Sequence, residues 1–540
     1  MERNFDLIHK IQPWPLVEPN FQESDFDLND VLSKTAGYGF KTLGLLQMMS
    51  VVIPVLPIAP MPGLFWSNEK RDLFKQTVIR ALKRNDVIVD QSIFEEDWKS
   101  FVDFEEELYG FRGSIIEEMV GVEDLKKAVP SMDIERIIKS FMRPKERDEM
   151  WERIKDSILI QKHPMLFGET KNLETILATT PKRTIANYLA FHLVGIMSGK
   201  EPTDCIKVVT ERLPLAALRV YVRNYFDKGN LKDVSDMVND IKKSYIKLFE
   251  ESKWLHDETR INAIRKVGAM THMIGYPEEL EEPGSLDKFF ESLDLSPSDS
   301  YFTAIQKTEK FYMELSIDFV AQLIRIWSYS IVLDANAFYL TMSNLLFVNV
   351  ALIDDPFFDS TYPKYAKLAG VGAVLGHEMG HGFDPENRKR DENGAMKNWW
   401  TPEDSKEYQK RAKCYADEYT NYDDPHYGKN LNGSFAITEI IPDVIGVKSA
   451  WKTYKSMDMS GEPGIIGFED YDLDKLYFQI GALTWCSSRK SKTLAEQQQD
   501  NHATPSFRVN GVFSNMKEFG ETFNCPVGSP MNPIKKCELF

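Results

Sequence analysis

The chain has 540 residues, enough for roughly two to four domains. An apolar share of 43%, with 12% aromatic residues, is typical of a globular protein, and the net charge of −17 argues against nucleic acid or an anionic membrane surface as a partner. The sequence contains no internal repeats, coiled-coil heptads or low-complexity tracts.

The chain predicts mainly amphipathic helices. An apolar run between Leu43 and Trp66 carries four prolines, so we expect a buried or loop segment there and no transmembrane helix. No signal-peptide pattern follows Met1. The acidic, Pro- and Gly-rich stretch from Tyr276 to Gly284 marks a surface linker between two lobes. Helical patterns cover residues 69–83, 133–141, 145–158, 182–197, 233–254 and 405–419.

The most informative motif is His377-Glu-Met-Gly-His381. On a helix the two histidines lie about one turn apart on one face, so both imidazoles can point at one zinc ion. Glu378 lies beside them, where it can take a proton from a water on that metal. The alternative is a surface helix with two unrelated histidines, but the small apolar residues from Gly372 to Gly376 favour a buried helix. Asp384, three residues past His381, can accept a hydrogen bond from an imidazole N–H.

A catalytic zinc site needs a third protein ligand, and Glu439 is the candidate. Glu439 and Asp443 share one face of a helix, so Glu439 could bind the metal while Asp443 holds the N–H of one histidine. A solvated acidic helix face is the common alternative for this spacing. It is disfavoured because the surrounding residues are apolar, and a buried carboxylate pair needs a cation. These apolar residues are Ile440, Ile441, Val444, Ile445 and Val447.

Together these motifs resemble the neprilysin-type (M13) zinc peptidases. The resemblance rests first on Val374–Asp384 around the histidine pair and on the Glu-x-x-x-Asp pair that follows it. It covers nearly the whole chain and is strong from about residue 210 onward. The other matching segments, in chain order, are Trp254–Arg260, Ile274–Pro277, Asn336–Tyr339, Asp355–Phe358, Trp399–Thr401, Leu431–Gly433, His502 to Arg508, and Met531–Phe540.

The resemblance implies a mainly α-helical, two-lobed zinc peptidase with a thermolysin-like H-E-x-x-H catalytic core. We expect a helical N-terminal lobe at residues 1–276, a linker with connecting helices at 277–332, and a C-terminal zinc catalytic domain at 333–540. In the family such lobes enclose a cavity that admits peptides and excludes folded proteins. Family members begin with a cytoplasmic tail and a membrane span, and we identify neither in this sequence. We therefore expect an extracellular or plasma-membrane ectodomain with a truncated start, which would reach a membrane only through that absent segment.

The resemblance also assigns the metal and the catalytic roles. One zinc ion per chain would be held by His377, His381 and Glu439. Glu378 would be the general base, and His502 would stabilise the oxyanion of the tetrahedral intermediate. By spacing alone, His502 is more simply a loop histidine. The residues that would orient the ligands are Asp384 and Asp443.

For the substrate, the resemblance implies backbone contacts from Asn336 and Ala337 and a carbonyl contact from Arg508. Small peptides would be cleaved on the amino side of hydrophobic residues. Ala373 and Thr484 stand where the family often has larger aliphatic residues, so we expect a wider, slightly more polar pocket. The pocket for the residue after the scissile bond would be lined by Leu352, Phe357, Val374 and Trp485.

One departure concerns the third ligand. The family usually shows E-N-I-A-D-N-G-G, whereas this chain reads Glu439-Ile-Ile-Pro-Asp-Val-Ile-Gly446. Pro442 removes a backbone N–H and crowds a preceding carbonyl, so Glu439 could shift by about an ångström. The rival function is therefore a non-catalytic descendant that binds or scaffolds peptides, although every ligand and orienting residue is retained. An unrelated H-E-x-x-H peptidase is a second alternative.

The chain has five cysteines, an odd number that is awkward for a complete secreted protein. The resemblance pairs Cys414 with Cys537. It gives Cys205, Cys486 and Cys525 partners in or around the missing upstream segment. Five free thiols in a cytosolic protein are the alternative that composition leaves open.

Overall fold

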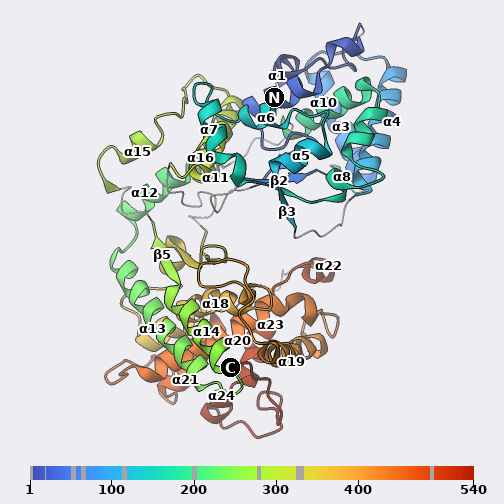
Figure 1. Cartoon of the computed structure of the whole chain (residues 1–540). Coiled ribbons are helices and arrows are strands. Elements are labelled where there is room, and N and C mark those ends of the chain that lie inside the picture. Colours follow the sequence, from blue (N-terminus) through green and yellow to red (C-terminus); the bar gives the residue numbers. More distant parts are fainter. Residues whose placement is uncertain are drawn as a thin grey trace. The chain divides into compact units, whose positions relative to one another are not determined.

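The computed structural model describes residues 4–18, 20–49, 56–61, 68–111, 118–197, 204–276, 281–323, 334–486 and 492–540. Within these ranges the chain is mainly helical, as predicted, with two small sheets (Figure 1). It packs into two compact units, one of Met1–Arg212 with Pro283–Tyr329 and one of Leu213–Glu282 with Ser330–Phe540. The division into domains at residues 276 and 332 stays a prediction.

The first unit contains a four-stranded sheet in the order β1-β2-β4-β3. β2 (Leu56–Pro60) pairs antiparallel with β1 (Leu46–Met48) and parallel with β4 (Ile158–Gln161), which in turn pairs antiparallel with β3 (Met119–Gly121). The described parts of the apolar run that begins at Leu43 are thus mostly buried strand, while residues 50–55 and 62–66 lie outside the described residues. Among the described helices, none combines the length and the apolar character that crossing a membrane requires.

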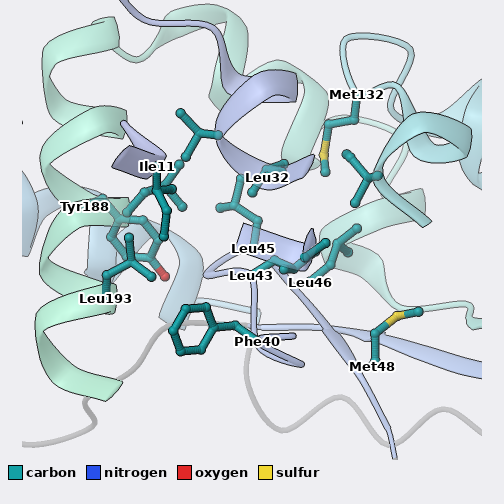
Figure 2. Close-up of a cluster of buried hydrophobic side chains, with 14 of the residues drawn as sticks. Ile11, Leu32, Phe40, Leu43, Leu45, Leu46, Met48, Met132, Tyr188 and Leu193 are labelled. Carbon is teal, nitrogen blue, oxygen red and sulfur yellow. The ribbon is translucent and has the colours of Figure 1, made fainter. Parts of the chain in front are cut away.

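The core of this unit forms around α10 (Lys182–Met197), a helix with buried residues on nearly every face. Several aromatic side chains of α4 (Gln91–Tyr109) pack against it. The ring of Phe191 lies 5.6 Å from that of Trp98 and 5.0 Å from that of Phe101, both in edge-to-face contact. Figure 2 shows part of the same buried cluster, in which Tyr188 and Leu193 of α10 lie beside Ile11 of α1 (Asn4–Ile11), while α2 (Leu28–Gly37) contributes Leu32.

The remaining helices of the first unit are α1 (Asn4–Ile11), α2 (Leu28–Gly37), α3 (Asn68–Arg84), α5 (Val122–Ala128), α6 (Ile134–Lys139), α7 (Arg147–Ile154), α8 (Pro164–Phe167), α9 (Leu173–Thr179), α11 (Cys205–Arg212), α15 (Ser285–Phe289) and α16 (Tyr301–Val320). One helix predicted from the sequence is too long. The pattern over 145–158 predicts a helix to its end, but α7 ends at Ile154 and Ile158 begins β4. Ile158 and Ile160 alternate with less buried residues and pair with β2, so the sheet determines this segment.

The second unit holds a three-stranded sheet in the order β5-β7-β6. β7 (Leu345–Asn349) runs parallel to β5 (Thr271–Gly275) and antiparallel to β6 (Ala337–Leu340). Within the described residues β6 is therefore an edge strand, and α18 (Ala373–Gly380) packs against it. The other helices of this unit are α12 (Pro214–Asn224), α13 (Gly229–Glu251), α14 (Asp257–Ala269), α17 (Lys364–Lys367), α19 (Pro402–Asn421), α20 (Gly433–Ser456), α21 (Leu473–Leu483), α22 (Leu494–Gln498), α23 (Pro505–Asn515) and α24 (Lys517–Thr522).

A disulfide joins α19 to the C-terminal segment. It links Cys414 to Cys537, as the family resemblance implies, with their Cα atoms 5.7 Å apart. The three other cysteines, which are all described, are free thiols. Beyond the disulfide, the ring of Phe540 stacks on that of Trp254 at 5.7 Å and is buried.

Candidate metal centre

The two histidines of the pentad lie on the last turn of α18 and in the single 3₁₀ turn that follows it, His381–Phe383. His377 and Glu378 are buried, so the helix is a core element and not a solvated one. The potential ligand atoms of His377, Glu378 and His381 all lie within 4.8 Å of one another. The spacing predicted from the sequence therefore brings both imidazoles to one point.

A glycine contact sets how closely α18 and α20 cross. A Cβ atom built on Gly446 of α20 would lie 2.4 Å from the backbone nitrogen of His377, and one built on Gly376 of α18 would lie 2.6 Å from the carbonyl oxygen of Gly446. One turn further along, a Cβ atom on Gly380 would lie 2.7 Å from the Cα atom of Pro442. Only glycine leaves room for such an approach. The crossing places Glu439 and Asp443 directly beside the histidines.

Pro442 lies inside α20, which continues to Ser456. The missing N–H therefore does not end the helix, and Glu439 still reaches the histidine pair. Its Oε2 atom lies 3.4 Å from Nε2 of His377 and 3.5 Å from Nε2 of His381. Four donor atoms around a tetrahedral zinc ion at about 2.0–2.1 Å would lie roughly 3.3 Å apart, close to the spacing found here.

Glu439 Oε2 is buried and accepts no hydrogen bond, whereas Oε1 accepts one from Nδ2 of Asn501 at 3.0 Å. Burial works to raise the pKa of Glu439, but the imidazoles of His377 and His381 outweigh it and lower the pKa below its usual value. A buried carboxylate oxygen that accepts no hydrogen bond, together with the two imidazole nitrogens that it faces, forms a donor set that suits zinc. The residues present thus fit the metal that the motif predicts.

Both histidines have carboxylate partners on the nitrogen that faces away from Glu439. Nδ1 of His377 lies 2.8 Å from Asp443, and Nδ1 of His381 lies 3.3 Å from Asp384. Burial lowers the pKa of His377, but Asp443 outweighs this effect and raises the pKa to about 9. Asp384 is itself held by the backbone N–H groups of Glu386 and Asn387, each at 2.8 Å. These contacts fix the rings so that their Nε2 atoms face the proposed metal.

Arg508 of α23 binds the same carboxylate as His377. Its Nε donates to Oδ2 of Asp443 at 2.8 Å and its Nη2 donates to Oδ1 at 2.5 Å. Burial disfavours an ionised Asp443, yet Arg508 and His377 together lower its pKa to about 2. The guanidinium also lies 3.6 Å from the ring centre of Trp485. The predicted contact of Arg508 with a substrate carbonyl stays a prediction.

Glu378 and His502 are the two candidates for proton and charge chemistry. Burial raises the pKa of Glu378 above its usual value, which favours its action as a proton acceptor. His502 is a loop residue, yet its Nε2 lies 3.5 Å from Oε2 of Glu439. Its side chain is 51% exposed, and its Nδ1 lies 3.0 Å from Asp500. The fold thus brings this loop histidine to the metal centre.

The predicted substrate-binding residues are spread over several elements. Asn336 is exposed just before edge strand β6, and Ala337 is its buried first residue. Val374 is one turn before His377 on α18. Trp485 contacts the guanidinium of Arg508, which binds Asp443. Phe357 is 40% exposed. A Cβ atom built on Gly370 would lie 3.7 Å from the carbonyl oxygen of Phe357 and 3.9 Å from the hydroxyl of Thr484. Leu352 is buried in the 3₁₀ turn Val350–Ile353, and Ala373 is half-buried at the start of α18.

The sequence did not identify three features of this centre. Asn501 contacts Glu439 although no motif marks it as a partner. Gly376 and Gly446 form the helix crossing, and a glycine inside an apolar helix was the available signal. Lys266 of α14 is buried, and its Nζ donates to the carbonyl of Gly382 at 2.6 Å and to that of Asn387 at 2.8 Å. It thereby ties together the loop that carries Asp384.

Comparison with known proteins gives one family. Two models of peptidase family M13 match the chain, an N-terminal one over residues 67–277 and a second over residues 336–539. Neprilysin-11 of Caenorhabditis elegans is 31% identical over 358 residues, which are 64% of this chain and 42% of that protein. Neprilysin-2 of Drosophila melanogaster is 30% identical over 413 residues, 68% of this chain and 53% of that protein. The chain spans about half the length of the curated relatives it matches.

Solved structures share the fold. A Mycobacterium tuberculosis zinc metalloprotease, Zmp1 in complex with an inhibitor, aligns with a TM-score of 0.76 at 17% identity and covers 99% of this chain and 85% of its own. PepO from Lactobacillus rhamnosis aligns with a TM-score of 0.74 at 18% identity, over 98% of this chain and 86% of its own. At this identity the likeness concerns the fold alone, and it agrees with the helical architecture described above.

Proposed function

This chain belongs to peptidase family M13, and we propose that it is a zinc-dependent endopeptidase that hydrolyses small peptides on the amino side of hydrophobic residues. The observation that carries the proposal is the convergence of His377, His381 and Glu439, with Oε2 of Glu439 buried and unpartnered between the imidazoles. A zinc ion bound there would supply a Lewis acid for the scissile carbonyl and acidify the attacking water.

The proposed roles of the protein groups follow from their surroundings. Glu378, whose pKa is raised by burial, would take the proton from the attacking water and pass it to the leaving amine. His502, half-exposed at the edge of the centre, would donate a hydrogen bond to the oxygen that gains negative charge. Asp443 and Asp384 would keep the two ligand rings in place.

Substrate binding would use the edge of the second unit's sheet. An extended peptide could add to edge strand β6 beside Asn336, which would bring its backbone along α18. The side chain after the scissile bond would lie among Phe357, Val374 and Trp485, with Thr484 widening the pocket. Leu352 would also line this pocket, and Ala337 would contact the substrate backbone together with Asn336. The extracellular or plasma-membrane location that the family resemblance implies belongs to this proposal as well.

The test uses purified, zinc-loaded protein and a mixed peptide library read by mass spectrometry. We expect cleavage on the amino side of apolar residues and inhibition by a phosphoramidate that mimics the tetrahedral intermediate. Glu378→Gln should keep about one zinc per chain and lose turnover by a factor of roughly 10³ or more, whereas Glu439→Ala should lose most of the zinc.

Two outcomes would contradict the proposal. Full zinc occupancy in Glu439→Ala would remove Glu439 from the ligand set. If the zinc-loaded wild-type protein retains peptides on a column but cleaves no member of the library, the chain is a peptide-binding protein without catalysis.

A further inference from the structure

The two oxygen atoms of the Glu439 carboxylate have different surroundings. Oε1 accepts a hydrogen bond from Nδ2 of Asn501 at 3.0 Å. Oε2 accepts none and faces the Nε2 atoms of His377 and His381. A carboxylate that is free to rotate can present both oxygens to a metal, whereas one held by a donor on Oε1 presents only Oε2.

Asn501 is held in place by the loop between α22 and α23. Nε2 of Gln497 donates to the carbonyl of His502 at 2.9 Å, and the backbone N–H of His502 donates to Asp500 at 3.0 Å. At the end of the loop, the hydroxyl of Thr504 donates to Asp424 at 2.6 Å. These hydrogen bonds restrict the conformations of the loop. The hydrogen bond from the Asn501 amide to Glu439 therefore forms with little further loss of conformational entropy.

The side-chain amide of Asn501 is a suitable hydrogen-bond donor to the carboxylate of Glu439. An ionised carboxylate only accepts hydrogen bonds, and the amide nitrogen is the donor that an asparagine offers to it. Glu439 is 7% exposed, so water is a poor substitute for this donor. Removal of the amide would leave Oε1 unsatisfied or let the carboxylate turn toward His502, whose Nε2 already lies 3.5 Å from Oε2.

We infer that Asn501 is a positioning residue, which holds Glu439 as a one-oxygen ligand aimed at the metal centre. This inference rests on the proposed function only in taking zinc as the metal. Asn501 itself touches neither the metal nor a substrate in this role. It acts through Glu439 and links the ligand to the loop that carries His502.

The experiment measures zinc affinity by competition with a chromogenic chelator in wild type, Asn501→Ala and Asn501→Asp. We expect the dissociation constant for zinc to rise by roughly 10- to 100-fold in Asn501→Ala. It should rise further in Asn501→Asp, because a second carboxylate then faces Glu439. Gln498→Ala is the matched control, since its amide donates to the carbonyl of Asn430 and not to a ligand. Its zinc affinity should equal that of wild type.

A spectroscopic measurement separates positioning from a general structural role. With cobalt in place of zinc, Asn501→Ala should show a changed visible spectrum at full occupancy, since a rotated carboxylate changes the coordination number. The unfolding temperature of the metal-free protein should stay within about 4 °C of the wild-type value, since only one buried hydrogen bond is lost. A dissociation constant within about twofold of wild type, or an unchanged cobalt spectrum, would overturn the inference.

The outcomes also distinguish this inference from the peptidase proposal. A wild-type protein that binds zinc and cleaves no peptide refutes the proposed function, while the Asn501 variants still decide the positioning role through their zinc affinity. A wild-type protein with no affinity for zinc overturns both.

Discussion

Gly446→Ala tests whether the contact between α18 and α20 sets the geometry of the metal centre. The new Cβ atom would lie 2.4 Å from the backbone nitrogen of His377, whereas an ordinary contact begins near 3.4 Å. The two helices would have to separate by about 1 Å, and overpacking of this kind costs about 1–3 kcal/mol. Glu439 lies on one helix and His377 on the other, so the same separation pulls the ligands apart.

We expect two effects from Gly446→Ala. The free energy of unfolding of the metal-free protein should fall by about 1–3 kcal/mol in urea denaturation. Zinc affinity should fall by roughly 10- to 100-fold, because a metal centre tolerates ligand displacements of only about 0.5 Å. Zinc affinity is measured by competition with a chelator, without urea and at a temperature well below the unfolding temperature.

Gly268→Ala is the matched control. Gly268 also lies inside a helix of the second unit, α14, but a Cβ atom there would meet nothing within 4 Å. It should leave zinc affinity unchanged and stabilise the protein by up to about 1 kcal/mol, since alanine is the better helix former. If Gly446→Ala behaves like Gly268→Ala in both measurements, the helix contact does not determine the site.

Three further predictions concern features around the centre. Burial lowers the pKa of Lys266 to about 7, so the unfolded chain binds more protons than the native one between about pH 7 and 10.5, and stability should rise with pH across this window. From pH 7 to pH 9 the deprotonation of Lys266 should add roughly 2 kcal/mol to the free energy of unfolding. Urea denaturation should show that Lys266→Met lacks this increase, and an equal increase in both proteins would refute the role of Lys266. The disulfide closes a loop between residues 123 positions apart, so Cys414→Ser with Cys537→Ser should cost roughly 2–5 kcal/mol, and alkylation of Cys414 in the native, non-reduced protein would contradict the pairing. Thr484→Leu should narrow the proposed pocket beside Gly370 and lower kcat/KM for peptides with phenylalanine after the scissile bond by roughly tenfold relative to peptides with leucine there, and an unchanged ratio of the two kcat/KM values would contradict the proposed pocket.

Local spacing was enough to predict that His377 and His381 converge and that Glu439 and Asp443 share a helix face beside them. The i, i+4 relation of His377 to His381, and of Glu439 to Asp443, depends only on helix geometry, and the apolar flanks indicated burial. The sequence left open which histidine Asp443 would hold, and the structure shows that it is His377. Contacts between segments that are remote in sequence were not predictable in this way. Asn501 and the glycine crossing depend on how separate helices and loops pack.

The same distinction applies to the fold. The helix at 182–197 was predicted with its bounds from its helical apolar pattern, and α10 spans these residues. The prediction for 145–158 was wrong at its end because β4 is determined by pairing with β2, a strand about a hundred residues earlier in the chain. Pro442 looked disruptive in isolation, but it lies at the helix crossing beside Gly380 and α20 continues through it.

The contacts of Arg508 restrict which mutations can change the peptide specificity of this protein during evolution. Its guanidinium is shared between Asp443, which holds the ligand His377, and Trp485, a wall of the proposed pocket. A mutation at Trp485 that selects a new peptide would therefore also disturb the partner of a metal ligand. Mutations at Phe357 carry no such linkage through Arg508. Evolution toward new peptides should thus proceed more readily at Phe357, and Trp485 should change only together with a compensating mutation near Asp443.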